Sequence, residues 1–177
     1  MVASDVLTFW LEAGPAKWFA KDAAFDADFR DRFYEAHFAA ARGEYVHWLE
    51  APDSALSLIL LLDQFPRNVF RGTGHMFSTD PLARSYALKA IEAGHDLSTD
   101  AGVRAFFYLP LVHSESLADQ ERAVELYVPL GEQWLPHAVE HRDIIARFGR
   151  FPHRNPLLGR ESTAQETEYL ASGGFSG

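Results

Sequence analysis

The sequence predicts an all-α protein of about nine helices, stacked as irregular helical hairpins. Glycine, proline and short polar residues recur where helices should begin and end, and the apolar residues between them follow a 3.6-residue period. No segment alternates apolar and polar residues as a half-buried strand does, and the chain contains no Asn-Gly or Asp-Gly hairpin signal. With 47% hydrophobic and 14% aromatic residues, the 177-residue chain can form a sizeable core.

The first two helices are indicated by their caps. Ser4 is a suitable N-cap for a first helix, which Gly14 ends. A second helix is expected from about Asp22 to Gly43, with acidic residues in its first turns, where the helix dipole favours them. Its apolar face is marked by residues three or four positions apart, namely Phe25, Phe29, Phe33, Ala36 and Ala40.

Proline delimits the next helices. A short helix is expected near residues 45–49, and a strongly apolar helix over residues 55–64, which Pro66 should stop because proline cannot donate the helical hydrogen bond. An Asp-Pro pair at residues 80–81 is typical of a helix start, and that helix should end at Gly94.

Two helices are expected in the middle of the second half. One should cover residues 99–108 and end before Pro110. The other should open at Ser116 or the next residue and meet Pro129 and Gly131, which either kink it or end it.

The last two helices have the clearest boundaries. Pro136 opens a helix that Gly149 closes. Thr163 and Glu166 then match a capping box, in which each side chain bonds the backbone of the other residue at the start of a helix.

Length, charge and composition restrict the class of protein. The length predicts a single domain over residues 1–171 with a flexible tail at 172–177. The net charge of −9 argues against a nucleic-acid partner, and the absence of cysteine excludes disulfides, cysteine-bound metals and a thiol nucleophile. Without a basic leader or an apolar run of ~20 residues, we expect no membrane partner and a cytoplasmic location.

Two stretches are unusually rich in polar residues among aromatic ones. LDQFPRNVFRG, residues 62–72, places acidic, amide and guanidinium groups beside three large apolar side chains. HRDIIARFGRFPHRNPLLGR, residues 141–160, holds five arginines and two histidines against one acid. The arginines either bind a carboxylate or phosphate ligand, or form internal ion pairs and helix caps that clasp a loop onto the body. A third alternative is contact with nucleic acid or a charged protein partner, and the composition leaves all three interpretations open.

A third stretch, FFYLPLVHSESLADQ at residues 106–120, places His113, Ser114 and Glu115 side by side. Sequence neighbours rarely point at each other, so this order does not indicate a nucleophile and its base. The simpler interpretation is the N-terminal region of a helix, and acid–base chemistry by His113 or Glu115 is the alternative.

Residues 137–141 match the H-x-x-E-H pattern of inverted zinc peptidases. Such a site needs a third ligand, normally well downstream, and only 36 residues follow. We therefore predict no metal site and two partly exposed helix histidines, His137 and His141.

The chain resembles a bacterial family of proteins of unknown function. The motifs that carry the resemblance follow one another in the order VLTFWLEAGPAKWFAKDAAFD, LDQFPRNVFRG, FFYLPLVHSESLADQ, RFGRFPHRN and LGRESTAQETEYL. The resemblance covers nearly the whole chain. It implies an all-α fold similar to a tetratricopeptide-repeat superhelix, and it implies no activity. The residues that match the family's motifs are Asp63, Gln64, Arg67, Asn68, Arg71, His113, Ser114, Glu115, Gln120, Arg147, Arg150, His153, Arg154, Asn155 and Arg160.

Three hypotheses for function follow. The first is a helical-repeat-like binding module for an anionic small molecule or an acidic peptide, with no cofactor. Its predicted ligand-binding residues are Asp63, Gln64, Arg67, Asn68, Arg71, His113, Glu115, Arg147, Arg150, His153, Arg154 and Asn155. The second is a hydrolase or lyase acting on an acidic metabolite, whose catalytic candidates are His113, Glu115 and His153. The third is a purely structural polar network.

Overall fold

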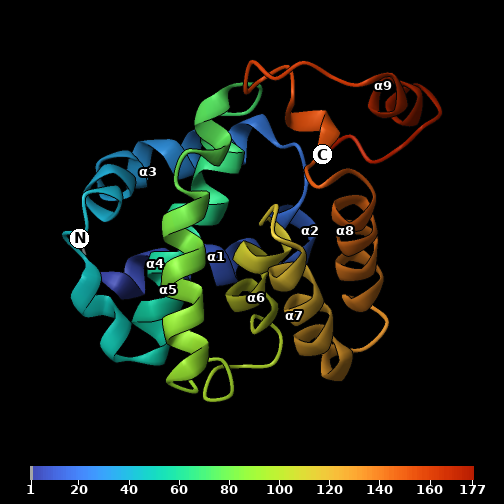
Figure 1. Ribbon diagram of the computed structural model, residues 1–177. Helices are drawn as coiled ribbons and strands as arrows, with labels where there is room; N and C mark the ends of the chain where they lie inside the picture. Colours follow the sequence, from blue (N-terminus) through green and yellow to red (C-terminus); the bar gives the residue numbers. More distant parts are fainter. Residues whose placement is uncertain (1) are drawn as a thin grey trace. The chain divides into compact units, whose positions relative to one another are not determined.

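The computed structural model describes residues 2–177 and is helical throughout its regular structure (Figure 1). Within these residues it has nine α-helices, four short 3₁₀ helices and no strand, so the all-α prediction is confirmed. The chain forms two compact units. Unit 1 comprises the described residues up to Arg71 together with His75–Pro110, and unit 2 comprises Gly72–Gly74 and Leu111–Gly177. The predicted single domain with a flexible tail stays a prediction.

The regular elements of unit 1 occur in the order α1 to α5, followed by most of α6. Their bounds are α1 Ala3–Ala13, α2 Pro15–Trp18, α3 Ala23–Ala41, η1 Val46–Glu50, α4 Pro52–Val69, η2 Gly74–Phe77, α5 Asp80–Glu92 and α6 Ala105–Val112. Gly74 belongs to unit 2, as do the last two residues of α6.

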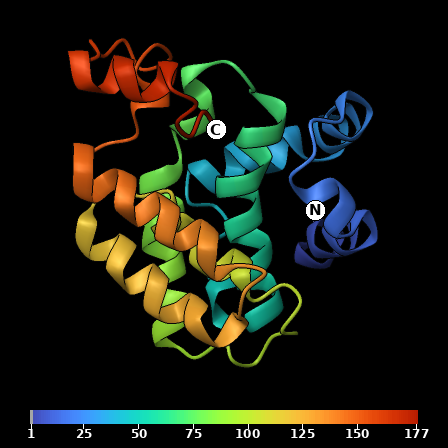
Figure 2. The same cartoon turned by 90° about the vertical axis from the view of Figure 1, so that its right-hand side faces the viewer.

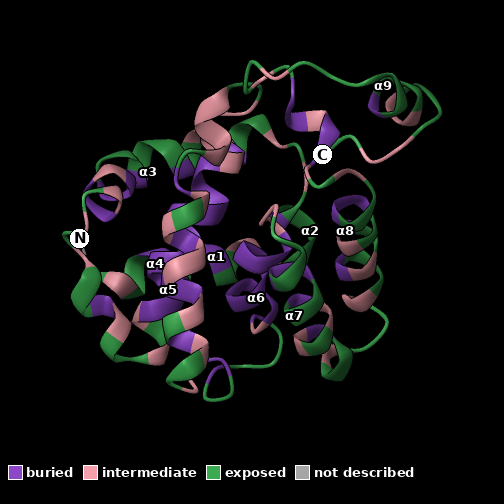
Figure 3. Ribbon diagram, in the orientation of Figure 1, coloured by how far each residue is buried: buried purple, intermediate pink, exposed green. Residues whose placement is uncertain are grey.

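Helix α4 is the central element of unit 1. It packs against α1, α3, α5 and η1, and most of its residues are buried, as the purple colour in Figure 3 shows. Phe29 of α3 is fully buried and has its ring centroid 5.0 Å from the rings of both Phe9 and Phe65. The apolar stripe predicted for α3 therefore forms part of an aromatic core.

Pro66 lies inside α4, so the prediction that it stops the helix is wrong. A proline at this position leaves the carbonyl of Leu62 without its helical N–H donor. The buried Thr79 hydroxyl donates to that oxygen instead, at 2.5 Å. A side chain from the start of the next helix thus takes the place of the missing backbone bond.

Other helix boundaries differ from those expected. Helix α1 begins at Ala3, so Ser4 is inside it and is not its N-cap. Helix α6 begins only at Ala105 and includes Pro110, so the helix predicted for residues 99–108 is shifted. The short elements α2 and η2 were not predicted, because a single turn carries too little periodicity to be recognised.

Unit 2 is built on the helix pair α7 Leu117–Tyr127 and α8 Leu135–Phe148, which lie side by side in Figures 1 and 2. The bounds of its remaining elements are η3 Val128–Leu130, η4 Pro152–Arg154 and α9 Ala164–Ala171. Its core contains Ile144, Ile145 and Phe151, against which Phe148, Tyr169 and Phe175 pack.

The predicted ends of α8 and α9 are confirmed. Gly149 has φ 70°, the left-handed conformation that glycine adopts without steric cost, and its N–H donates to the carbonyl of Ile145 at 2.8 Å. Thr163 and Glu166 form the capping box of α9. Among residues 2–177, no helix combines the length and the apolar character that crossing a membrane requires.

Candidate functional site

The first polar stretch lies on the last turns of α4, where its charged groups form internal pairs. The Arg67 guanidinium donates to both oxygens of Asp80, at 2.8 and 3.0 Å, and to the backbone carbonyl of Asp63 at 2.8 Å. Burial acts to lower the pKa of Arg67, but the carboxylates of Asp63 and Asp80 outweigh it and raise that pKa. Arg67 is therefore a fixed cation that connects α4 to the start of α5.

Helix α4 is also connected to α3 through Asp26. Asn68 donates its amide to Asp26 at 2.8 Å, and Arg71 donates two N–H groups to the same carboxylate at 2.6 and 3.1 Å. Gln64 donates to the carboxylate of Asp63 at 2.7 Å. The five candidate residues of this stretch thus form two polar groups within unit 1, one with Asp80 and one with Asp26.

In unit 2, the loop after α8 is held by two further ion pairs. Arg150 donates to both oxygens of Glu166, at 2.6 and 2.8 Å, and Arg160 donates to both oxygens of Glu115, at 2.7 and 2.9 Å. Arg160 also donates to the side-chain oxygen of Asn155 at 2.9 Å. These contacts connect the loop after α8 to Glu115 and to Glu166 of α9.

Glu115 is occupied by this clasp. Besides Arg160, it accepts the backbone N–H of Phe151 at 2.8 Å. Burial acts to raise the pKa of Glu115, but its hydrogen bonds from Arg160 and Phe151 outweigh this effect and lower it. Arg147, another candidate, lies with its guanidinium carbon 4.6 Å from the ring centroid of Phe148 and 5.5 Å from that of Tyr169.

Three basic side chains, those of Arg154, His141 and His153, surround the buried ring of Phe151, and together with His113, which lies beside His141, we call them the basic cluster. The guanidinium carbon of Arg154 lies 4.5 Å from the ring centroid of Phe151. The ring centroids of His141 and His153 lie 5.5 and 5.7 Å from it, and that of His113 lies 6.5 Å from His141. Three of these residues, His113, His153 and Arg154, were predicted from the sequence.

The pKa of His141 reflects its burial and the positive charge of the basic cluster. The pKa of His141 is lowered to about 3, mainly by burial and also by the positive charges of His113, Arg154 and His153. Its Nδ1–H donates to the carbonyl of His137 at 2.7 Å, so the neutral ring has its lone pair at Nε2.

The H-x-x-E-H pattern does not place two equivalent histidines on the surface. His137 is exposed, whereas His141 is only 9% exposed, which corrects the expectation that both would be partly exposed. Within residues 2–177, no group of three or more histidine or acidic side chains is arranged to hold a metal ion.

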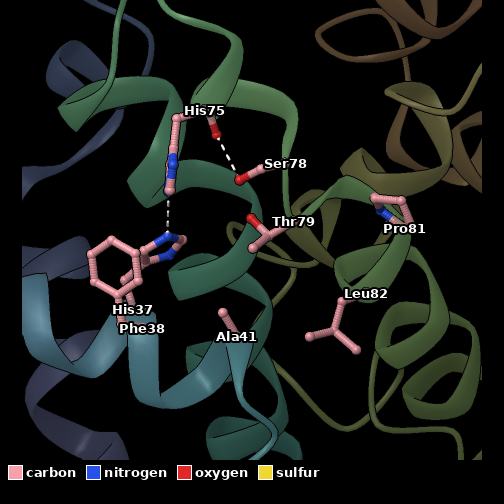
Figure 4. A pocket seen from close by; sticks show the side chains of 8 residues that line it. All are labelled: His37, Phe38, Ala41, His75, Ser78, Thr79, Pro81 and Leu82. Carbon is pink, nitrogen blue, oxygen red and sulfur yellow. Dashed lines mark hydrogen bonds between the residues drawn. The ribbon is translucent and has the colours of Figure 1, made fainter.

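Sequence reasoning missed a second histidine site, in unit 1. His37 of α3 and His75 of η2 approach each other with their Nε2 atoms 3.2 Å apart, beside a pocket (Figure 4). His37 falls one residue after Ala36 in the apolar stripe of α3, and it is fully buried. A histidine on an apolar helix face was the available signal, but its partner is 38 residues away.

The fold and the site describe an all-α protein with internally paired polar groups in each unit, a basic cluster and a histidine pair beside a pocket. The family model of bacterial proteins of unknown function (DUF924) matches residues 6–174, so the chain belongs to this family. It is similar to a solved structure of a protein of unknown function from Agrobacterium tumefaciens, with 60% identity, a TM-score of 0.95 and 97% of each chain covered. A search of curated proteins finds no match.

Proposed function

We propose that the protein is a binding module and that its basic cluster in unit 2 holds an anionic ligand, either a small molecule with a carboxylate or phosphate group or the acidic end of a peptide. The observation that supports this proposal most directly is the gathering of Arg154, His113 and His153 around Phe151 and His141. Guanidinium and imidazole N–H groups are the donors that bind carboxylate and phosphate oxygens best.

The other predicted arginines are better explained as structure. Arg67, Arg71 and Arg150 each donate two or more hydrogen bonds to a carboxylate within their own unit. Removing such a guanidinium would leave its carboxylate partner without a counter-charge and destabilise the fold, as expected for a structural ion pair. The proposed site is therefore smaller than the set of residues predicted from the sequence.

Arg154 is suited to its proposed role because its position is fixed before a ligand arrives. It is only 6% exposed, stacks on Phe151 and donates to the carbonyl of His113 at 3.0 Å. A donor that is already ordered loses little conformational entropy on binding. His113 and His153 are half-buried, so they remain accessible at the edge of the cluster.

The test is a ligand-dependent thermal shift, measured with phosphate, citrate and a panel of carboxylate metabolites at constant ionic strength. A ligand at 100 times its Kd adds about 2.7 kcal/mol to the free energy of unfolding. For a protein of this size, each kcal/mol raises Tm by roughly 2–4 °C, so we expect a shift of roughly 5–10 °C.

Two matched variants separate specific binding from general salt effects, which stabilise most proteins. Arg154→Gln should abolish the shift. Arg122→Gln removes the same charge from an exposed arginine of α7, which pairs with Glu125, and should keep the shift. Equal shifts in both variants, or no shift in the wild type with any anion, would refute the proposal.

His141 supplies an independent readout. A bound anion would offset the positive charges that lower its pKa, so the pKa of His141 should rise above about 3 when the ligand binds. Histidine NMR resonances measured from pH 3 to 7, with and without the anion, would detect this change.

Catalysis by a histidine is the second candidate function. A general base needs a pKa near the working pH, which His141 does not have, so the half-buried His113 and His153 are the residues that would carry this chemistry. Proton and phosphorus NMR of each binding anion, incubated with the protein, distinguishes the two functions. A binding module returns the anion unchanged, whereas a hydrolase or lyase converts it.

A further inference from the structure

The histidine pair of unit 1 borders a pocket of about 350 Å³, a volume typical of small-molecule sites. The pocket lies between α3, η2 and the start of α5 (Figure 4). Its lining combines apolar side chains with two imidazoles and two hydroxyl groups: His37, Phe38, Ala41, His75, Ser78, Thr79, Pro81 and Leu82. None of these residues carries a fixed charge, so the pocket favours a neutral ligand.

The hydrogen bonds of the pair determine where its protons lie. His37 Nδ1 is 2.8 Å from the backbone carbonyl of Leu61, and a carbonyl oxygen can only accept. Nδ1 of His37 therefore carries the proton, and Nε2 of a neutral His37 is an acceptor. His75 faces that acceptor with its own Nε2 at 3.2 Å and must donate.

The neutral state of His37 follows from its surroundings. The side chain is fully buried and its ring stacks on Phe65, with centroids 4.9 Å apart and planes 21° apart. Burial is the main cause that lowers the pKa of His37 below its usual value. At neutral pH the ring is thus uncharged, and it is hydrogen-bonded to both the Leu61 carbonyl and His75.

One acceptor remains at the end of this chain. In a neutral His75 whose Nε2 donates to His37, Nδ1 carries a lone pair, and the hydrogen bonds found for the His75 ring among residues 2–177 do not occupy it. The two hydroxyls already donate elsewhere, Ser78 to the carbonyl of His75 at 3.0 Å and Thr79 to that of Leu62. Nδ1 of His75 and the hydroxyl oxygens of Ser78 and Thr79 therefore offer acceptors to a ligand.

We propose that this pocket binds a neutral small molecule that has an apolar body and one O–H or N–H group, which donates to Nδ1 of His75. His37 positions His75 by fixing its tautomer, and Phe38, Pro81 and Leu82 contact the apolar body. The site is in unit 1 and its ligand is uncharged, so it is separate from the anion site proposed in unit 2, and the two proposals fail independently.

The first experiment compares two probes of similar size, phenol and anisole, titrated into ¹⁵N-labelled protein and followed by NMR. Phenol has the required O–H donor, and anisole carries a methyl group in its place. We expect phenol to bind with a Kd of about 1 mM, as suits a fragment of seven heavy atoms, at least about fivefold tighter than anisole. The shifted amides should be those of pocket residues on α3, η2 and α5.

Two variants test the acceptor. His75→Phe keeps an aromatic ring but removes both nitrogens, so the ratio of the two Kd values should fall to about one. His137→Phe makes the same change at an exposed position of α8 and should leave the ratio unchanged. Three results would each overturn the proposal. They are a ratio of the two Kd values near one in the wild type, an unchanged ratio in His75→Phe, and no binding of either probe.

The tautomer assignment can be tested without any variant. Nitrogen-15 NMR of the wild-type histidine side chains at neutral pH should find His75 protonated at Nε2 and unprotonated at Nδ1. The opposite tautomer would remove the acceptor from the pocket and overturn the proposal, whatever the probes do.

Discussion

Glu166 is the residue whose ion pair gives the stability of the fold a defined dependence on pH. It is only 2% exposed, accepts two hydrogen bonds from Arg150 and accepts the backbone N–H of Thr163 at 2.7 Å. The hydrogen bond from Arg150 is the main cause that lowers the pKa of Glu166 from 4.5 to about 2, against an opposing effect of burial. The substitution Glu166→Gln removes the charge and keeps a residue that a capping box accepts.

The magnitude follows from the shifted pKa. Each pKa unit corresponds to about 1.4 kcal/mol, so the ion pair contributes up to about 3 kcal/mol at neutral pH. Water reaches Arg150, whose side chain is 28% exposed, and screens the pair. We therefore expect Glu166→Gln to lower the free energy of unfolding by about 2 kcal/mol at pH 7, and Tm by roughly 4–8 °C.

The pH dependence has a defined sign. Since the folded-state pKa lies below the unfolded one, the carboxylate stabilises the fold above pH 4.5, and this stabilisation is lost as the pH falls toward 2. The difference between wild type and Glu166→Gln should be constant from pH 7 to about pH 6 and fall by more than half at about pH 3.

Urea unfolding followed by circular dichroism at several pH values measures this difference directly. Glu168→Gln is the matched control, because Glu168 lies on the same helix and is exposed. It should change the free energy of unfolding by no more than ~0.5 kcal/mol. A loss of less than ~0.5 kcal/mol for Glu166→Gln, or a difference that does not change with pH, would refute the reasoning.

Three further predictions concern other parts of the molecule. Arg67→Ala should lower the free energy of unfolding by about 3–5 kcal/mol in urea titrations, because it leaves the carboxylate of Asp80 without its bidentate partner; a loss below ~1 kcal/mol would contradict this. Phe29→Ala should cost about 3–5 kcal/mol in the same assay, since the ring is fully buried among other aromatics, and a smaller cost would mean that the core collapses around the gap. Because the pKa of His141 is lowered to about 3, the wild type should lose stability as the pH falls from 6.5 toward 3, and His141→Gln should lose less over that range; parallel curves would contradict this.

Local patterns in the sequence were sufficient to predict the helical class and several helix ends. The stripe on α3, the left-handed Gly149 and the capping box of Thr163 and Glu166 each depend on residues within a few turns of one another. Caps and the 3.6-residue period act through neighbouring backbone groups, so the sequence alone specifies them. The same patterns identified the residues of the polar stretches, although not what those residues bind.

Only the tertiary structure shows which side chains far apart in the sequence contact each other. Glu115 meets Arg160 from 45 residues away, and His37 meets His75 from 38 residues away. Pro66 continues a helix because the hydroxyl of Thr79, 17 residues later in the chain from Leu62, occupies the carbonyl that proline leaves without a donor. Periodicity shows which face of a helix is buried but not which side chain lies opposite it, because that depends on how helices distant in the sequence pack together.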